Sequence, residues 1–342
     1  MASKIWFITG TSRGFGRIWA EAALERGDRV TATARDITAI QPLTDKYGDA
    51  VLPMTLDITD ATADRVAVER AFDHFGRVDV IVNNAGYGLF GAVEEVTEEQ
   101  ARRQIDTGLF GALWITQTAL RYLRAQGSGH IVQVSSLAGL VAIPYLGMYQ
   151  AAKFGLEGYS ESLAAEVAAH GIKVTIVEPA PYNTDWVYGS KEVAAPNPAY
   201  DHIRAWWDEH FGATAKADPE GVRQAMLDLV DSNEPPLRLL LGSYGLPVVE
   251  AVYAQRLAAW KAWKEVADAA GGRPSDTAQR GTAEARNGIR HPRAWNAAAL
   301  IAASQPVAEV AEQNRAQRAM NPTAKVASDS RVPAAAENDA VA

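Results

Sequence analysis

The sequence predicts an α/β fold in which a doubly wound parallel sheet of about seven strands carries helices on both faces. Short runs rich in valine, isoleucine and leucine alternate with segments of helical periodicity, and a glycine-rich turn follows the first run. Runs without polar alternation indicate strands buried on both faces, and the regular change to helix indicates parallel crossovers. The expected strands are 5–8, 29–34, 51–56, 78–82, 130–134, 173–177 and 237–241, and the expected helices include 18–26, 63–75, 99–125 and 149–170.

The first strand ends in a glycine-rich turn that runs directly into a helix. The turn reads Thr9-Gly10-Thr11-Ser12-Arg13-Gly14-Phe15-Gly16. Glycines let the backbone turn sharply and approach a diphosphate, whose charge then faces the amides at the helix N-terminus. Ordinary tight turns also use glycines, but their place between a buried strand and a helix predicts a Rossmann-type dinucleotide site. The expected contacts are Gly10, Ser12, Arg13, Gly14, Phe15 and Gly16.

Residues at the end of the second strand indicate which dinucleotide is bound. Folds that bind NAD place an acid there for the ribose hydroxyls, whereas an arginine accommodates the additional phosphate of NADP. Here the strand ends at Ala34 and Arg35, and Arg13 of the glycine turn supplies a second guanidinium group. Two guanidinium groups suit a phosphate, so we expect NADP(H). The alternative is a pair of solvated surface arginines, and Asp36 is an acid close by.

A serine, a tyrosine and a lysine after the fifth strand form a candidate reaction centre. Tyr149 and Lys153 are four residues apart on one expected helix, so they share a face, where the ammonium group favours the ionised phenol. Ser136 lies thirteen residues before the tyrosine. Its hydroxyl group is expected to hold a carbonyl oxygen beside the phenol, as hydride transfer to a ketone requires. Such a spacing alone also arises by chance in helices.

Five motifs along residues 1–245 resemble those of the short-chain dehydrogenase/reductase family. They are the glycine turn, Asn83-Asn84-Ala85-Gly86 after the fourth strand, Ser136, the pair Tyr149 and Lys153, and Glu178-Pro179-Ala180 to Thr184 after the sixth strand. The resemblance, to NADP-preferring ketoreductases, implies that NADPH delivers a hydride to a carbonyl carbon. It makes Tyr149 the proton donor, Ser136 the group that orients the oxygen, and Lys153 the group that lowers the Tyr149 pKa and holds the nicotinamide ribose.

The resemblance also implies further contacts with the cofactor. Asp57 is expected at the adenine amino group, with Ile58 beside it, and Thr184 at the nicotinamide carboxamide. A purely structural reading makes Asp57 the cap of the following helix. The remaining expected contacts are Asn84, Ala85 and Gly86 on the adenosine side, and Pro179.

The chain departs from the family pattern at three positions. Gly108 stands where relatives carry a catalytic asparagine, which puts the proton relay to the lysine in doubt. Ala180 replaces a glycine, and Pro181 follows it, so the backbone beside the nicotinamide is stiffer. These changes suggest an altered active-site wall, and a simply drifted relative explains them equally well.

A substrate lid is expected at about 182–217, with residues 87–90 and 137–147 completing the wall. Aromatic residues are dense there, which suits a bulky or aromatic ketone, although they also suit helix packing or a subunit contact. These residues are Trp186, Tyr188, Tyr200, Trp206, Trp207 and Phe211. One domain is expected over 1–274, ending in a helix at 248–269 that packs on the fold or on another subunit. The alanine-rich extension 275–342 lacks the apolar residues for a second core.

Composition narrows the class of protein. The formal net charge of −8 argues against nucleic-acid and anionic-membrane partners. The absence of cysteine excludes disulfides and thiolate catalysis, and it fits a reducing cytoplasm. No signal peptide, membrane span or metal-ligand cluster is expected from the sequence.

Three functions fit these observations. The first is an NADPH-dependent carbonyl reductase or alcohol dehydrogenase that acts on a small ketone or secondary alcohol, as a homodimer or homotetramer. The second is an NADP-binding sensor or interaction protein with weakened catalysis, and the third is an epimerase. The intact Ser136, Tyr149 and Lys153 favour the first, because a protein that only binds the cofactor needs no proton donor.

Overall fold

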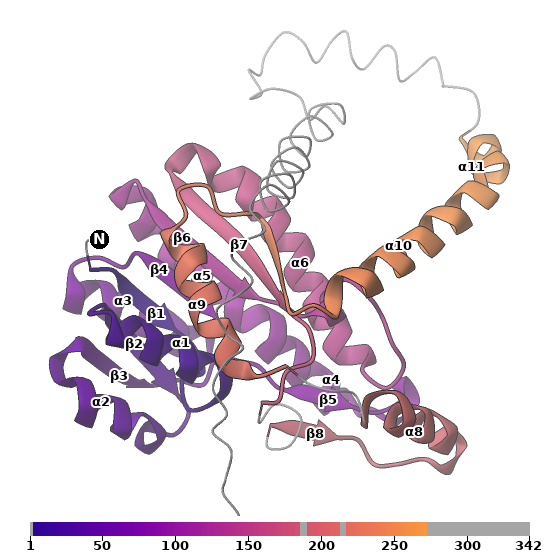
Figure 1. Cartoon of the computed structure of the whole chain (residues 1–342), viewed down its shortest axis with the longest axis horizontal. Coiled ribbons are helices and arrows are strands. Elements are labelled where there is room, and N and C mark those ends of the chain that lie inside the picture. The colour runs from indigo at the N-terminus through magenta and orange to yellow at the C-terminus, as the bar shows by residue number, and fades with distance from the viewer. Residues whose placement is uncertain (1–2, 185–189, 213–216, 272–342) are drawn as a thin grey trace, which may run out of the picture. The chain divides into compact units, whose positions relative to one another are not determined.

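The computed structural model describes residues 3–184, 190–212 and 217–271. Its main strands are β1 Ile5–Ile8, β2 Arg29–Ala34, β3 Val51–Thr55, β4 Val80–Asn83, β6 Gly129–Val134, β7 Ile172–Pro179 and β9 Arg238–Leu241. All seven are parallel and lie in the order β3-β2-β1-β4-β6-β7-β9 (Figure 1), which confirms the predicted fold class. The order reverses between β1 and β4, where such a sheet binds its ligand.

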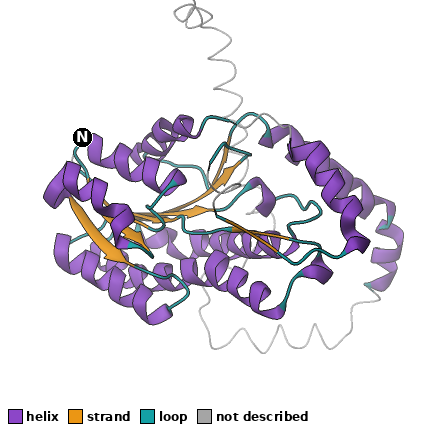
Figure 2. Cartoon of the chain, turned by 90° about the horizontal axis from the view of Figure 1, so that it is seen from below, coloured by secondary structure: helices purple, strands orange, loops and turns teal. Residues whose placement is uncertain are grey.

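Helices cover both faces of this sheet (Figure 2). They are α1 Gly14–Glu25, α2 Gln41–Tyr47, α3 Ala61–Phe75, α4 Glu98–Ile105, α5 Gly111–Gln126, α6 Gly147–Val167, α8 Asp201–Trp207, α9 Val222–Asp231, α10 Gly245–Ala262 and α11 Lys264–Ala270. One face is covered by α1, α2 and α9, with Trp19 and Met226 in its core. The other face is covered by α3, α5 and α6, with Ile115 and Leu163 in its core.

Several short elements are not among the predicted ones. β5 Gly88–Phe90 and β8 Lys191–Val193 pair in parallel as a second, small sheet. Three residues are too few to show a periodic pattern, so the sequence gives no sign of these strands. The 3₁₀ turns are Ile37–Ile40, Gly48–Ala50, Val93–Glu95, Leu137–Gly139, Ala168–His170, Pro198–Tyr200 and Pro219–Gly221, and Asp208–Gly212 is π-helical.

The helix predicted at 99–125 is interrupted by a π-helical segment, Asp106–Phe110, between α4 and α5. Gly108 is buried in this segment and lies against α6. A Cβ atom on Gly108 would be 3.0 Å from Cβ of Ala152 and 3.2 Å from Nε2 of Gln104. The interpretation of Gly108 as a vacated asparagine position is therefore incomplete, because neighbouring side chains already fill the space where a side chain would begin.

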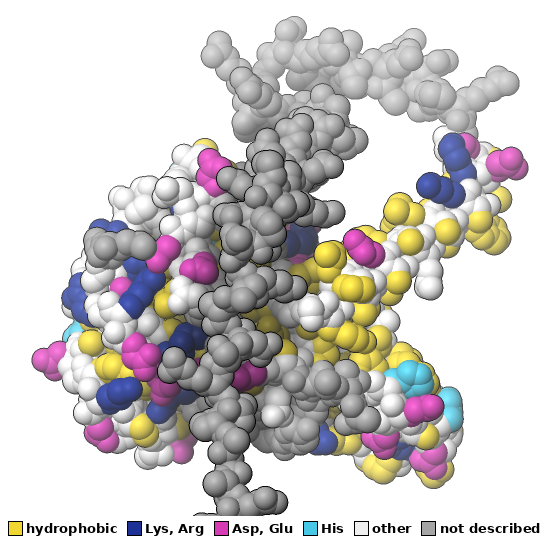
Figure 3. All heavy atoms as spheres, in the orientation of Figure 1, with side chains coloured by type: hydrophobic (Ala, Val, Ile, Leu, Met, Phe, Trp, Pro, Cys, Tyr) yellow, Lys and Arg dark blue, Asp and Glu magenta, His cyan; other side chains and the backbone are white. Residues whose placement is uncertain are grey.

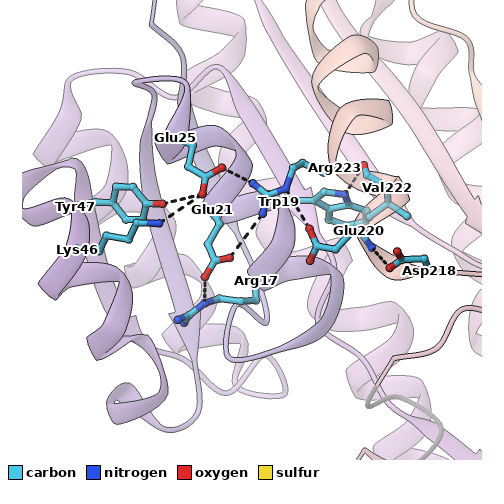
Figure 4. A network of polar contacts seen from close by, with 10 residues as sticks. All are labelled: Arg17, Trp19, Glu21, Glu25, Lys46, Tyr47, Asp218, Glu220, Val222 and Arg223. Carbon is cyan, nitrogen blue, oxygen red and sulfur yellow. Dashed lines mark hydrogen bonds and ion pairs between the residues drawn. The ribbon is translucent and has the colours of Figure 1, made fainter. Parts of the chain in front are cut away.

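A buried indole and an arginine join α9 to α1 (Figure 4). Trp19 is fully buried, and its Nε1 donates a hydrogen bond of 3.2 Å to the carbonyl oxygen of Val222. Arg223 forms a 2.7 Å ion pair with Glu25 and lies 3.9 Å from Glu21. Partly exposed ion pairs contribute about 0–1 kcal/mol each, so the packing of the indole dominates. This contact fixes α1, whose N-terminus carries the glycine turn.

The helix predicted at 248–269 is observed as α10 and α11, but much of α10 does not pack on the fold. Its hydrophobic side chains form an exposed stripe (Figure 3), in which Trp260 is 69% and Trp263 67% exposed. Packing against Leu137 and its neighbours is confined to Val248, Val249 and Val252. Tyr253, Leu257, Trp260 and Trp263 are exposed, so of the two predicted partners, the fold and another subunit, the fold is not the one that they pack on. A contact with another subunit stays a prediction.

The first compact unit of the chain ends at Lys264. The predicted boundary at 274 and the extension 275–342 lie outside the described residues. Within the described part of the chain, no helix has the length and apolar character needed to cross a membrane. The same residues contain no cluster of histidine and acidic side chains that could bind a metal ion.

The close contact at Gly108 predicts a coupled effect of two substitutions. Gly108→Ala should lower the free energy of unfolding by about 1–3 kcal/mol, because its methyl group would press on Ala152. Ala152→Gly is the matched change, since it removes the methyl group that the new side chain meets. In denaturant unfolding, the double variant should be less destabilised than the sum of the single variants. Strictly additive free energies would contradict the contact.

Candidate active site

A cavity of about 730 Å³ opens at the carboxyl ends of the strands, beside the point where the strand order reverses. This size is typical of a small-molecule or cofactor site. Of the predicted site residues, the cavity is lined by Gly10, Ser12, Arg13, Gly14, Phe15, Arg35, Asp57, Ile58, Asn84, Ala85, Gly86, Ser136, Tyr149, Lys153, Pro179 and Thr184. Gly16 is the exception, because it is buried beneath the glycine turn.

Two glycines of the turn, Gly10 and Gly16, are packed so closely that they have no room for side chains. A Cβ atom on Gly16 would lie 2.3 Å from the carbonyl oxygen of Gly10, and one on Gly10 would lie 2.9 Å from Cα of Ala85. Nδ2 of Asn84 donates hydrogen bonds of 2.8 Å to Thr9 O and 3.2 Å to Gly10 O. The turn after β4 thus fixes the shape of the turn after β1. This arrangement fits a diphosphate, which needs bare backbone and amides at the start of α1.

Two arginines line the cavity near the end of β2. Arg13 and Arg35 are both exposed, and within the described ranges neither forms an ion pair with a carboxylate. Asp36 does not line the cavity. Its Oδ1 accepts hydrogen bonds from Oγ1 and the backbone N of Thr38, at 2.7 and 2.9 Å, and these hold its pKa below the ordinary value. This end of β2 therefore presents cations to a ligand.

Asp57 does not cap the helix that follows it. Its Oδ1 accepts hydrogen bonds from the backbone N and Oγ1 of Thr59, at 3.0 and 2.8 Å. The cap of α3 is Asp60, whose Oδ1 accepts from the backbone N of Thr62 and Ala63 at 2.8 and 3.1 Å. The structural reading of Asp57 as a helix cap is wrong, and its carboxyl group remains at the cavity wall.

Ser136, Tyr149 and Lys153 meet at one end of the cavity. Ser136 follows β6, and its Oγ accepts a 3.1 Å hydrogen bond from the backbone N of Ala138. Tyr149 and Lys153 are buried in the first two turns of α6, and Nζ of the lysine lies 5.8 Å from the centre of the tyrosine ring. The lysine donates a 2.7 Å hydrogen bond to the carbonyl oxygen of Val134, the last residue of β6.

Burial changes the pKa values of the tyrosine and the lysine. It raises the pKa of Tyr149 to about 12, although a hydrogen bond with Ser136 acts to lower it. It lowers the pKa of Lys153 to about 8, although the carboxylate of Glu157 acts to raise it. The prediction that Lys153 brings the pKa of Tyr149 towards neutrality is wrong for this structure. Desolvation of the phenol outweighs its hydrogen bond with Ser136, and the ammonium group of Lys153 is bonded to a backbone carbonyl instead.

Aromatic side chains of the predicted lid form one wall of the cavity. The ring of Trp207 stacks on Phe211, with centroids 4.5 Å apart, and meets the edge of Phe90 at 5.4 Å. All three line the cavity. Trp206 instead stacks on His210 at 4.7 Å, so the two tryptophans differ in role. The lid residues 185–188 lie outside the described residues.

The lid is joined to the rest of the fold through β8. This strand pairs with β5, which follows the Asn-Asn-Ala-Gly turn. Glu192 of β8 also forms a 2.7 Å ion pair with Arg103 and accepts a 2.9 Å hydrogen bond from Nε2 of Gln100. The lid strand is therefore held against α4 by both backbone and side-chain contacts.

Some residues of the cavity wall are not among the predicted site residues. They include Arg103, Tyr244 and Val248, of which the last two lie at the start of α10. Tyr182, the first residue of the predicted lid, lines the cavity as well. Tyr182 also meets the edge of the Phe15 ring at 5.2 Å. No local motif marks them, because tertiary packing alone brings them to the site.

Comparisons with known sequences agree with this geometry. A sequence profile described as short chain dehydrogenase matches residues 4–193. Oxidoreductase BOA17 of Botryotinia fuckeliana is 41% identical over 244 residues, which cover 70% of this chain and 89% of that protein. A 3-ketodihydrosphingosine reductase of Bacteroides thetaiotaomicron is 34% identical over 259 residues, which cover 75% of this chain and 92% of that protein.

A crystal structure of a short-chain dehydrogenase from Streptomyces avermitilis has the same fold. The two chains superpose with a TM-score of 0.75 at 36% sequence identity. The match covers 79% of this chain and 98% of the other. The likeness therefore extends over most of this chain.

The hydrogen bonds of Asn84 form a clamp between the turn after β4 and the glycine turn, and this clamp predicts a specific effect of Asn84→Asp. A carboxylate would face the carbonyl oxygens of Thr9 and Gly10 with no proton to donate, at a cost of roughly 1–3 kcal/mol. Binding of a reduced nicotinamide dinucleotide, NADH or NADPH, measured by nucleotide fluorescence, should weaken together with the melting temperature. Asn84→Ala is the matched control, because it removes the donor without adding a charge. The aspartate variant should be the weaker binder, and equal binding by both would contradict the role of the clamp.

Proposed function

The chain belongs to the short-chain dehydrogenase family, and we propose that it is an NADPH-dependent carbonyl reductase or alcohol dehydrogenase for a bulky or aromatic ketone or secondary alcohol. The observation that carries the proposal is the meeting of Ser136, Tyr149 and Lys153 in one cavity with the glycine turn. A hydroxyl, a phenol and an amine at this place suit proton transfer to a carbonyl oxygen. A protein that only senses the cofactor would need none of them.

The chain's own residues supply binding, orientation and the proton. When bound, the dinucleotide supplies the hydride. The hydroxyl group of Ser136 is placed to orient the substrate oxygen, and the phenol of Tyr149 to donate a proton to it. Because burial keeps Tyr149 protonated at neutral pH, the phenol is in the state that reduction requires. The ammonium group of Lys153 is placed to stabilise the phenolate that remains.

The walls of the cavity favour a large apolar substrate. Next to Tyr149, apolar side chains of Val141, Ile143 and Leu146 line it together with Phe90 and Trp207. Such a surface gains from burying a hydrocarbon or aromatic group, roughly 25 cal/mol per Å². The Bacteroides relative is named for the reduction of 3-ketodihydrosphingosine, which supports a ketone as the reacting group.

The preference for NADPH rests on the charge at the end of β2. Arg13 and Arg35 are placed as two guanidinium groups beside the cavity, whereas the carboxylate of Asp36 is engaged by Thr38. A phosphate on the adenosine ribose would meet guanidinium donors there.

Replacement of Tyr149 by phenylalanine tests the reaction. With NADPH and a panel of bulky ketones, consumption followed at 340 nm should fall by about 10²–10⁴-fold, because the proton donor is lost. Fluorescence of bound NADPH should show that the cofactor still binds. Unchanged consumption would refute the role of Tyr149. Tight binding without consumption by the wild-type protein would favour a sensor, and isomerised product without net consumption would favour an epimerase.

Replacement of Arg35 by alanine tests the cofactor. Loss of charge-assisted hydrogen bonds to a phosphate costs about 1.5–3 kcal/mol, so the Kd for NADPH should rise by about 10–100-fold. The Kd for NADH measured on the same variant is the internal control, because NADH lacks that phosphate, and it should change little. Equal weakening for both nucleotides would show that Arg35 does not read the phosphate.

A further inference from the structure

A cluster of buried charges lies behind the reaction centre and does not line the cavity. Tyr149, Lys153 and Glu157 follow one another at four-residue intervals on α6, so Glu157 continues the catalytic face by one turn. The side chain of Glu157 is 7% exposed, and that of Glu178 on β7 is 1% exposed. Carboxyl groups are seldom so buried unless a cation accompanies them.

The accompanying cation is Arg238 of β9. Its Nε lies 3.2 Å from Oε2 of Glu157 and 3.4 Å from Oε1 of Glu178. Its Nη2 lies 2.9 Å from Oε2 of Glu161, one further turn along α6, where the side chain is 53% exposed. A single guanidinium group thus serves two buried carboxyls and one surface carboxylate.

The other neighbours of Glu157 are a serine and a glycine. Burial raises the pKa of Glu157, and the hydroxyl of Ser135, the residue before Ser136, acts to lower it. A Cβ atom on Gly139 would lie 2.5 Å from Oγ of Ser135 and 3.2 Å from Oε1 of Glu157. Glycine at 139 therefore leaves the room in which these two side chains approach each other.

The charges in the cluster do not balance fully. Burial raises the pKa of Glu178 to about 8, with Glu157 raising it further and Arg238 lowering it. Burial is also the largest effect on Glu157, and it raises the pKa of that carboxyl. Glu157 is the carboxyl that Ser135, Arg238 and Lys153 all favour as an anion, against the effect of burial. For Lys153, burial favours the neutral amine, and Glu157 opposes it.

We propose that Glu157, held by Arg238 and flanked by Glu178 and Ser135, is a positioning residue that keeps the buried amine of Lys153 charged beside Tyr149. The proposal rests on the proposed function, since it assigns the support of that same site. It also explains why a lysine can sit in a buried position next to a backbone carbonyl and still act as a cation.

The test is the pH dependence of kcat/KM for Glu157→Gln. Removing the carboxylate lowers the pKa of Lys153, so the charged amine is lost at lower pH. The alkaline limb should shift down by about one pH unit or more. Arg238→Gln should shift the limb in the same direction, because Glu157 then binds a proton more readily. This second variant changes β9 and leaves the sequence of α6 intact. It therefore tests the proposal even if Glu157→Gln does not fold.

Glu161→Gln is the matched control, because it makes the same chemical change to another partner of Arg238 at the surface. The alkaline limb of its pH profile should lie at the same pH as that of the wild-type protein. NADPH binding across the same pH range gives a readout that needs no substrate, so the inference is decided even if no ketone is reduced. If the alkaline limb of kcat/KM in both Glu157→Gln and Arg238→Gln lies at the same pH as in the wild-type protein, the proposal is overturned. An equal shift in Glu161→Gln would overturn it too, since any nearby charge would then suffice.

Discussion

The hydrogen bond from Lys153 to the carbonyl oxygen of Val134 ties the chemistry to the sheet. It joins the first turns of α6 to the end of β6, so Tyr149 and Lys153 on the helix are held in a fixed position relative to Ser136 after the strand. Such a bond requires the helix to lie close to the strand ends. Small residues make this possible, because Gly108 rests on Ala152 and Leu109 fits beside Gly155, where a Cβ atom would come within 2.9 Å. The geometry of the reaction centre is thus set by packing several residues away.

The part of the cavity proposed to bind the cofactor also depends on close contact between two backbone segments, the glycine turn and the turn after β4. Gly10 and Gly16 touch each other and the turn after β4, and Asn84 bonds to the carbonyl oxygens that this contact leaves exposed. The same turn ends at Gly86, whose Cβ position would be 3.9 Å from Nζ of Lys153. One segment after β4 therefore lies beside both the glycine turn and Lys153. A ligand that orders this segment would act on both ends of the site together.

The sequence predicts the strands and the cavity residues well, because continuous apolar runs and ordered motifs are local signals. What it misses depends on burial and on distant packing. The pKa of Tyr149 moves in the direction opposite to the expectation, since the spacing to Lys153 does not reveal how far the phenol is desolvated. Gly108 is a packing contact as well as a departure from a motif. The exposure of Trp260 is equally invisible, because the apolar pattern of α10 does not show which of its residues pack on the fold. Glu157 is visible as a four-residue step beyond Lys153, but its partner Arg238 lies 81 residues away.

The buried charges behind Lys153 are best understood through their cost. Moving a carboxylate or an ammonium group out of water costs several kcal/mol, and replacing buried ion pairs by apolar side chains is often neutral or stabilising. Glu157, Glu178 and Lys153 all lie in the interior, and Arg238 is the one cation that bridges the two acids. Stability alone gives no reason for this arrangement, since leucine-like side chains would fill the same space. A cation that must stay charged next to a buried phenol does give one, because an apolar neighbour in place of Glu157 would leave burial unopposed and favour the neutral amine.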